Sequence, residues 1–156
     1  MPIDPRTKIG HVHLTVSDLD RSLAFYRDVL GFEVTARYGA DAVFVSAGGY
    51  HHHIGLNTWA GRGAPQPPPG TTGLYHFAIL LPDRAALAAT VRRVLEQGIP
   101  LEGASDHGVS EAIYLRDHDG NGLELYRDRP ESEWPRGSDG TIRMHTRPLD
   151  LEALLA

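Results

Sequence analysis

The segment HVHLTVSDLDRSLAFYRDVLGFEV, residues 11–34, combines a strand pattern with a helix pattern. Apolar and polar side chains alternate over residues 12–16, which predicts a half-buried strand. Ser17 or Asp18 can then cap a helix, because apolar residues recur at helical spacing from there until Gly31. A glycine just past the last helical residue is a common stop signal. The segment therefore predicts a strand followed by a helix.

A second segment, HFAILLPDRAALAATVRRVLEQGIPL at residues 76–101, repeats this pattern. It also opens with histidine, crosses an apolar strand and reaches an aspartate that begins a helix ending at glycine. His76 follows His11, and Asp83 follows Asp18, by the same offset of 65 residues. Such an internal repeat indicates two copies of one structural unit.

Short strand-like runs complete each unit, so that both units read β-α-β-β-β. The runs lie at 33–38, 42–47 and 52–58 in the first unit and at 100–106, 110–116 and 122–127 in the second. We expect an α+β fold in which two βαβββ modules form a curved mixed sheet. The helices are expected on the outer face and the site in the concavity.

Proline and glycine dominate AGRGAPQPPPGTTG, residues 60–73, which cannot form a helix or a central strand and marks a linker. Either unit alone is too small for a comfortable core, so we predict one domain. The predicted boundaries are 8–128 for the domain, 8–59 and 73–128 for its modules and 60–72 for the linker. A C-terminal extension follows at residues 129–156, and its last residues, LDLEALLA, favour a short helix.

The composition excludes several classes of protein. The chain has 156 residues and a net charge of −5 with scattered basic residues, which argues against nucleic-acid binding. No apolar run approaches the ~20 residues of a membrane helix, and the first residues do not resemble a secretion signal. We therefore expect a cytoplasmic protein without a membrane partner. Because cysteine is absent, any metal must be held by His, Asp or Glu.

Strand parity places three possible metal ligands on one side of the sheet. Alternate residues of a strand face the same way, so His11, His76 and Glu124 oppose the apolar residues of their three strands. A single histidine at a strand start is more often structural or solvated than a ligand. Two histidines that open both copies of a repeat favour one constellation with the glutamate.

These segments resemble the vicinal-oxygen-chelate superfamily, which includes glyoxalase I, bleomycin-resistance proteins, fosfomycin-resistance enzymes and extradiol dioxygenases. The segment at 11–34 resembles the family's opening unit. YLRDHDGNGLELYRDRP, residues 114–130, is similar to its closing strand, where the glutamate of G-N-x-L-E-L-Y binds the metal. GGYHHHIGLNTWAG (48–61) and SDHGVSEAIYLRDHDGNGLELY (105–126) most resemble the N-terminal half of catechol 2,3-dioxygenase-like proteins.

The resemblance implies that His11, His76 and Glu124 bind a divalent metal ion, with Fe(II) expected first and Mn, Ni or Zn as alternatives. Such a triad leaves open positions for substrate and oxygen. Gly55 occupies the repeat position of Glu124, where glyoxalase I has a fourth ligand. Glycine cannot ligate, which favours a dioxygenase, although His53 lies two residues away on the same face.

The resemblance also implies roles for residues around the metal. Tyr114 is expected to orient the substrate and His107 to act as an acid or base, although a core tyrosine and a solvated turn histidine fit equally well. The expected pocket residues are His13, His53, Trp59 and Tyr126. Alternation along the HHH run would point His51 and His53 toward the site and His52 away from it.

Three functions fit the sequence. The first is an Fe(II) extradiol-type dioxygenase that cleaves the ring of a catechol-like diol with O2. The second is another metalloenzyme of the superfamily, a glyoxalase-like lyase or isomerase or a thiol transferase, with Mn, Ni or Zn. The third is a non-enzymatic small-molecule binding or resistance protein, which is disfavoured because all three ligands are present. A homodimer is expected.

Overall fold

The computed structural model describes residues 1–156 and divides into two compact units, Met1–Pro65 and Gln66–Ala156. The division falls within the proline- and glycine-rich segment. Both units follow the predicted βαβββ order, and the α+β class is confirmed. The strands hydrogen-bond as one mixed sheet in each unit, with four strands in the first and five in the second.

The first unit is a four-stranded sheet with one helical segment. Its elements are β1 (Val12–Thr15), α1 (Leu19–Leu23) with a π-helical continuation (Ala24–Val29), β2 (Glu33–Tyr38), β3 (Ala42–Ser46) and β4 (Ile54–Asn57). The strand order is β1-β4-β3-β2, and β1 runs parallel to β4. Asp18 caps α1, because its carboxylate accepts the Arg21 amide at 2.9 Å.

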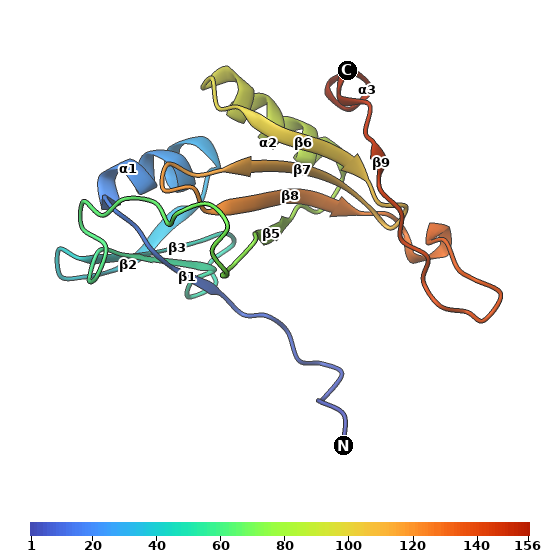
Figure 1. The fold of residues 1–156 in the computed structure, drawn as a ribbon, viewed down its shortest axis with the longest axis horizontal. Helices are drawn as coiled ribbons and strands as arrows, with labels where there is room; N and C mark the ends of the chain where they lie inside the picture. Colours follow the sequence, from blue (N-terminus) through green and yellow to red (C-terminus); the bar gives the residue numbers. More distant parts are fainter. The chain divides into compact units, whose positions relative to one another are not determined.

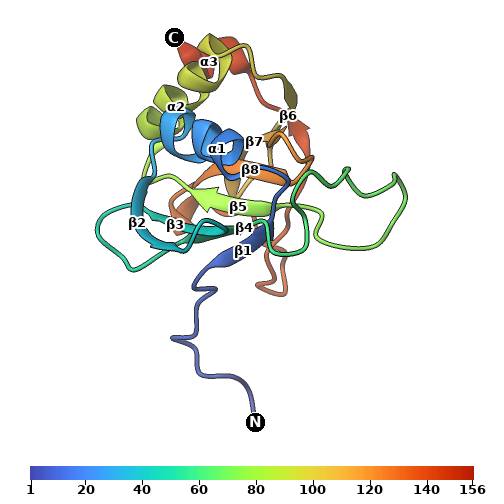
Figure 2. The same cartoon turned by 90° about the vertical axis from the view of Figure 1, so that its left-hand side faces the viewer.

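The second unit is a five-stranded sheet covered by helices. Its elements are β5 (Phe77–Leu80), α2 (Arg84–Glu96), β6 (Leu101–Asp106), β7 (Ser110–Arg116), β8 (Gly122–Asp128), a 3-10 turn (Glu131–Glu133), β9 (Arg147–Pro148) and α3 (Leu151–Leu155). The strand order is β5-β8-β7-β6-β9. Figure 1 shows α2 over one face of this sheet, and Figure 2 shows α3 beside α2.

The buried side chains follow the predicted alternation. Leu14 and Val16 of the first unit and Leu123 and Leu125 of the second are at most 5% exposed, and Glu124 between the two leucines is not buried. The apolar faces therefore form the cores, and the opposite faces carry the polar residues. None of the helices, of which α2 is the longest with 13 residues, could cross a bilayer.

The prediction for the HHH run is wrong. Residues 51–53 form a bend, and the strand begins at Ile54 rather than at residue 52. Alternation therefore does not govern these histidines, since it holds only within a strand. His52, expected to point away from His11, packs against it, with ring centroids 4.4 Å apart.

Candidate metal centre

His76 and Glu124, two of the predicted metal ligands, lie in contact in the second unit. β5 and β8 are parallel neighbours, and the residue after Phe77 pairs with Glu124. His76 Nε2 consequently lies 3.0 Å from Glu124 Oε2. Gly122 allows this approach, because a Cβ there would lie 2.2 Å from the carbonyl oxygen of Tyr75.

Tyr114 extends this pair to a third strand. It lies opposite Glu124 in the β7–β8 register, and its hydroxyl is 3.3 Å from Glu124 Oε1. The same hydroxyl lies 2.7 Å from His107 Nε2. Four of the predicted residues of this unit are thus joined in the order His76, Glu124, Tyr114, His107.

The phenol of Tyr114 stays protonated at neutral pH. Partial burial, together with the charge of Glu124 and the hydrogen bond to it, raises the pKa of Tyr114 to about 12. Its ring also packs against that of His76, with centroids 5.6 Å apart. A neutral hydroxyl is therefore held beside His76 and Glu124 as a hydrogen-bond donor.

A hollow of about 300 Å³ adjoins these side chains, and Gly103 and Ser105 of β6 contribute to its wall with His76 and Tyr114. Tyr126 lies on β8 two residues beyond Glu124, on the same face of the strand. Burial and nearby carboxylates raise its pKa. The hollow is large enough for a small aromatic ring beside His76 and Tyr114.

The other predicted residues belong to the first unit. The His13 ring contacts Trp59 at 5.6 Å and Phe44 at 5.7 Å between centroids. Burial, with a contribution from the neighbouring His11, lowers the pKa of His13. His13 is thus held as a neutral aromatic surface.

His53 has a structural role in this unit. Its Nδ1 accepts the Ala47 amide at 3.3 Å and lies 3.0 Å from the Ser46 hydroxyl. These bonds tie the residue before β4 to the end of β3. The nitrogen that faces them is occupied and is not free to bind a metal.

Gly55, the position of a possible fourth ligand, lies beneath His13. The two residues pair in the β1–β4 register, and a Cβ on Gly55 would lie 2.9 Å from His13 Cγ. A side chain at position 55 would therefore displace the His13 ring. In the first unit the larger side chain of this strand pair is His13, and in the second unit it is Glu124.

The donor set in the second unit fits a divalent metal ion. Two ligands with bonds of about 2.1 Å lie roughly 3 Å apart when they bind at right angles, which matches the 3.0 Å separation of His76 Nε2 and Glu124 Oε2. Imidazole and carboxylate are also the donors that iron and manganese accept. Neither unit by itself gathers three such side chains. His11 remains a predicted ligand from the sequence.

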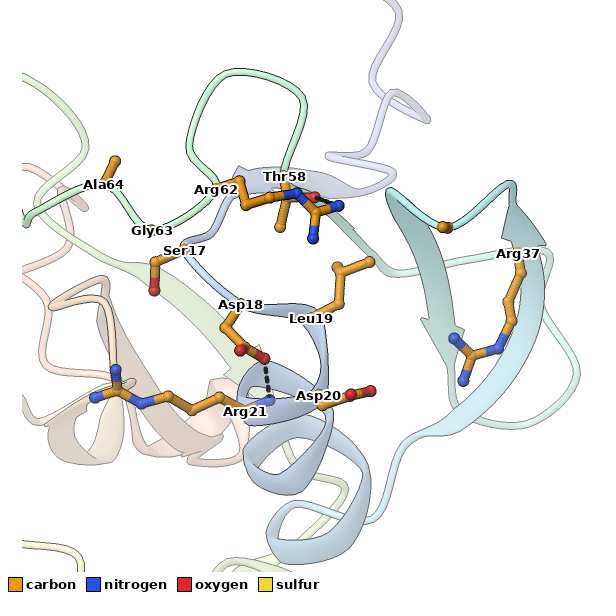
Figure 3. A pocket seen from close by; sticks show the side chains of 11 residues that line it. Ser17, Asp18, Leu19, Asp20, Arg21, Arg37, Thr58, Arg62, Gly63 and Ala64 are labelled. Atoms are coloured by element: carbon orange, nitrogen blue, oxygen red, sulfur yellow. Dashed lines mark hydrogen bonds between the residues drawn. The ribbon is translucent and has the colours of Figure 1, made fainter.

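A second hollow, of about 580 Å³, lies in the first unit and has a different character. Figure 3 shows charged side chains of both signs around it, with Asp18 bonded to the backbone of Arg21. Arg62 pairs with Asp41. No histidine lines this hollow, and the Asp18 carboxylate already caps α1, so it does not resemble a metal centre.

Two contributors escaped prediction from the sequence. His52 packs against His11 from a bend that has no regular pattern. The carbonyl oxygen of His145, in the C-terminal extension, lies 3.0 Å from His107 Nδ1. A backbone carbonyl carries no sequence signal, so only the path of the chain reveals it.

Comparison with known proteins defines the family. The model of the Glyoxalase/Bleomycin resistance protein/Dioxygenase superfamily matches residues 8–125, and the chain belongs to this superfamily. Catechol-2,3-dioxygenase of Bacillus subtilis is 44% identical over 149 residues, which cover 96% of this chain and 51% of that protein. Biphenyl-2,3-diol 1,2-dioxygenase 3 of Rhodococcus globerulus is 33% identical over 82% of this chain and 66% of its own length.

This chain therefore spans about half to two thirds of the length of these two relatives. Among solved structures, lactoylglutathione lyase from Agrobacterium tumefaciens matches with a TM-score of 0.60 and 29% identity, over 80% of this chain and 96% of that one. The superfamily thus contains similar proteins named for different reactions, and the site must distinguish between them.

Proposed function

We propose that this chain is a metal-dependent, extradiol-type dioxygenase that cleaves the ring of a catechol-like diol with O2. The observation that carries the proposal is the joined series His76, Glu124, Tyr114 and His107. It occurs in a chain 44% identical to a protein named catechol-2,3-dioxygenase. A histidine and glutamate can bind a metal ion, a neutral phenol can hydrogen-bond a diol, and an imidazole can move a proton.

His11, His76 and Glu124 are the proposed ligands of one divalent ion, with Fe(II) first. When bound, a metal ion with open positions brings a diol and O2 together and passes electron density between them. The triad leaves such positions because it supplies only three protein donors.

The remaining residues bind the diol and move its proton. Tyr114 holds a phenolic proton beside Glu124 and is placed to hydrogen-bond a diol oxygen. His107 Nε2 contacts the same hydroxyl and is placed to exchange a proton with the substrate through it. His13, Trp59 and Tyr126 are the proposed aromatic surfaces that contact the substrate ring.

Gly55 favours this reaction over a glyoxalase-type lyase or isomerase. A carboxylate cannot occupy position 55 as a fourth ligand while the His13 ring lies over it. A centre with three protein ligands retains more vacancies for a bidentate diol and O2. Mn, Ni or Zn in the same triad is the alternative, with Lewis-acid chemistry.

We also propose that the chain forms a homodimer. β5 is the edge strand of its sheet, and it exposes Leu80, while Leu74 and Tyr75 are exposed just before it. Neighbouring exposed apolar side chains typically mark a surface that another protein surface covers. A second copy is the partner that fits an internally repeated chain.

The direct test is anaerobic loading of the full chain with Fe(II), followed by a panel of catechols and oxygen. Oxygen uptake with a yellow ring-opened product is expected. Glu124→Gln should abolish turnover, and Glu133→Gln, at an exposed glutamate, should not. An iron-loaded chain that consumes no oxygen with any diol would contradict the proposal, and a chain that retains no metal would favour a binding protein.

A further inference from the structure

The C-terminal extension, residues 129–156, lies beyond the family match at 8–125 and still contacts the proposed site. We propose that its residues 143–148 act as a positioning segment that fixes the orientation and tautomer of His107. Its consequence for catalysis rests on the proposed function. The positioning itself is a property of the fold and can be measured separately.

His145 binds His107 through two backbone groups. The His145 amide donates to the His107 carbonyl oxygen at 3.2 Å, and the His145 carbonyl oxygen lies 3.0 Å from His107 Nδ1. A carbonyl oxygen can only accept, so Nδ1 carries the proton in this bond. The Thr146 hydroxyl lies 3.3 Å from the same nitrogen.

The His107 tautomer determines which neighbour accepts the phenolic proton of Tyr114. When Nδ1 carries the proton of a neutral ring, Nε2 is an acceptor. Nε2 at 2.7 Å then competes with Glu124 Oε1 at 3.3 Å for the single phenolic proton, and the shorter contact favours His107. The opposite tautomer would place a proton on Nε2 and turn the Tyr114 hydroxyl toward Glu124.

Backbone pairing holds the segment in place. β9 pairs with β6, where Arg147 lies opposite Asp106, and the Leu149 amide donates to the Ala104 carbonyl at 3.1 Å. α3 follows directly. It is bound to α2 by two guanidinium groups, from Arg84 and Arg92, which donate to its carbonyl oxygens at 2.9 and 2.6 Å.

Ion pairs fix the start of the extension to the same turn. Arg129 lies 2.6 Å from Asp106 and 3.2 Å from the buried carboxylate of Glu111. Arg127 completes the group at 2.8 Å from Glu111. The extension is therefore anchored on both sides of the residues that contact His107.

Gly108 shows how closely the segment approaches the turn. A Cβ at this position would lie 2.6 Å from the His145 ring and 2.9 Å from Pro135, and φ is +77°. Gly140, in the same extension, has a similar φ of +79°, but a Cβ there would meet no atom within 4 Å. Alanine at 108 combines backbone strain with a clash, while alanine at 140 has the strain alone.

The test is ¹⁵N NMR of the histidine rings in the full-length chain, at a pH where His107 is neutral. The Nδ1-protonated tautomer is expected in the wild type, with slow exchange of the His145 amide. An Nε2-protonated His107 in the wild type would overturn the proposal, whatever the variants show.

Gly108→Ala should lose the tautomer preference, and Gly140→Ala should keep it. In the iron-loaded enzyme, kcat for Gly108→Ala should fall on the order of tenfold to a hundredfold, with KM little changed. A folded Gly108→Ala protein with the wild-type tautomer would also overturn the proposal. A wild type with the expected tautomer and no turnover would instead contradict the proposed function and leave the positioning role supported.

Discussion

The pair His13 and Gly55 in the first module corresponds to the pair Ala78 and Glu124 in the second, with the large and small side chains on opposite strands. His13 pairs with Gly55, and Ala78 pairs with Glu124, at the same register position of the two strand pairs. In each pair a large side chain stands beside a small one. The His13 ring thus crowds position 55, where a glutamate side chain would meet it.

This pairing predicts strong coupling between the two positions. Gly55→Glu alone should destabilise the chain by about 1–3 kcal/mol, because the new side chain meets the His13 ring. The double variant His13→Ala, Gly55→Glu should recover part of this loss. Urea unfolding of the four proteins measures the coupling, which we expect at about 0.5–3 kcal/mol. Additive losses would show that the two positions do not compete for space.

The β6–β7 turn is the element on which the site and the extension meet. Asp106 ends β6, accepts the Gly108 amide at 2.8 Å and pairs with Arg129 at 2.6 Å. Partial burial raises the pKa of Asp106, but these two partners lower it by more, so that the net pKa lies below the ordinary value of 3.8. The ionised carboxylate therefore stabilises the turn.

The lowered pKa predicts the sign of the pH dependence. A group with a lowered pKa in the folded state stabilises the fold above its unfolded pKa and loses that contribution as the pH falls through the folded value. The free energy of unfolding should therefore decline as the pH drops below about 4. Asp106→Asn should flatten this decline, as followed by urea unfolding between pH 2 and 7 (approximate limits of the titration).

A control separates this contribution from the loss of any negative charge. Asp20→Asn removes an exposed carboxylate of α1 and should leave the acid dependence unchanged. Equal slopes for Asp106→Asn and the wild type would show that the turn does not depend on this carboxylate.

Periodic elements could be predicted from the sequence, and irregular ones could not. The alternation around Leu14 and Leu125 predicted the strands and their buried faces, and Asp18 and Asp83 cap their helices as their positions indicated. β9 has only two residues, too few to show a period. Its pairing depends on the path of the extension, which local residue patterns do not encode.

In the candidate site, too, the residues on regular strands could be predicted and those set by irregular backbone could not. Glu124 and Tyr114 are brought together because strand register is regular, and the paired histidines of the repeat pointed to His76. The position of His52 escaped prediction because a bend sets its direction. The bond from His107 to a backbone carbonyl was equally hidden.

At the scale of the whole molecule, the exposed apolar residues at β5 predict self-association. Sedimentation equilibrium should give twice the chain mass of 17.1 kDa. Leu80→Lys should weaken the dimer, because it places a charge on an exposed apolar edge. Leu95→Lys, on the half-exposed side of α2, is the control and should remain dimeric. A monomeric wild type would contradict this prediction.

The proposed metal ligands His11, His76 and Glu124 can be tested directly. The most direct measurement is anaerobic Fe(II) titration of the full chain, compared with His11→Ala, His76→Ala and Glu124→Gln, with His118→Ala as a control. We predict one ion per chain for the wild type and the control, and at least about tenfold weaker binding for each ligand variant. Undiminished affinity in His11→Ala, with loss in the other two, would contradict the proposed role of His11 as a ligand.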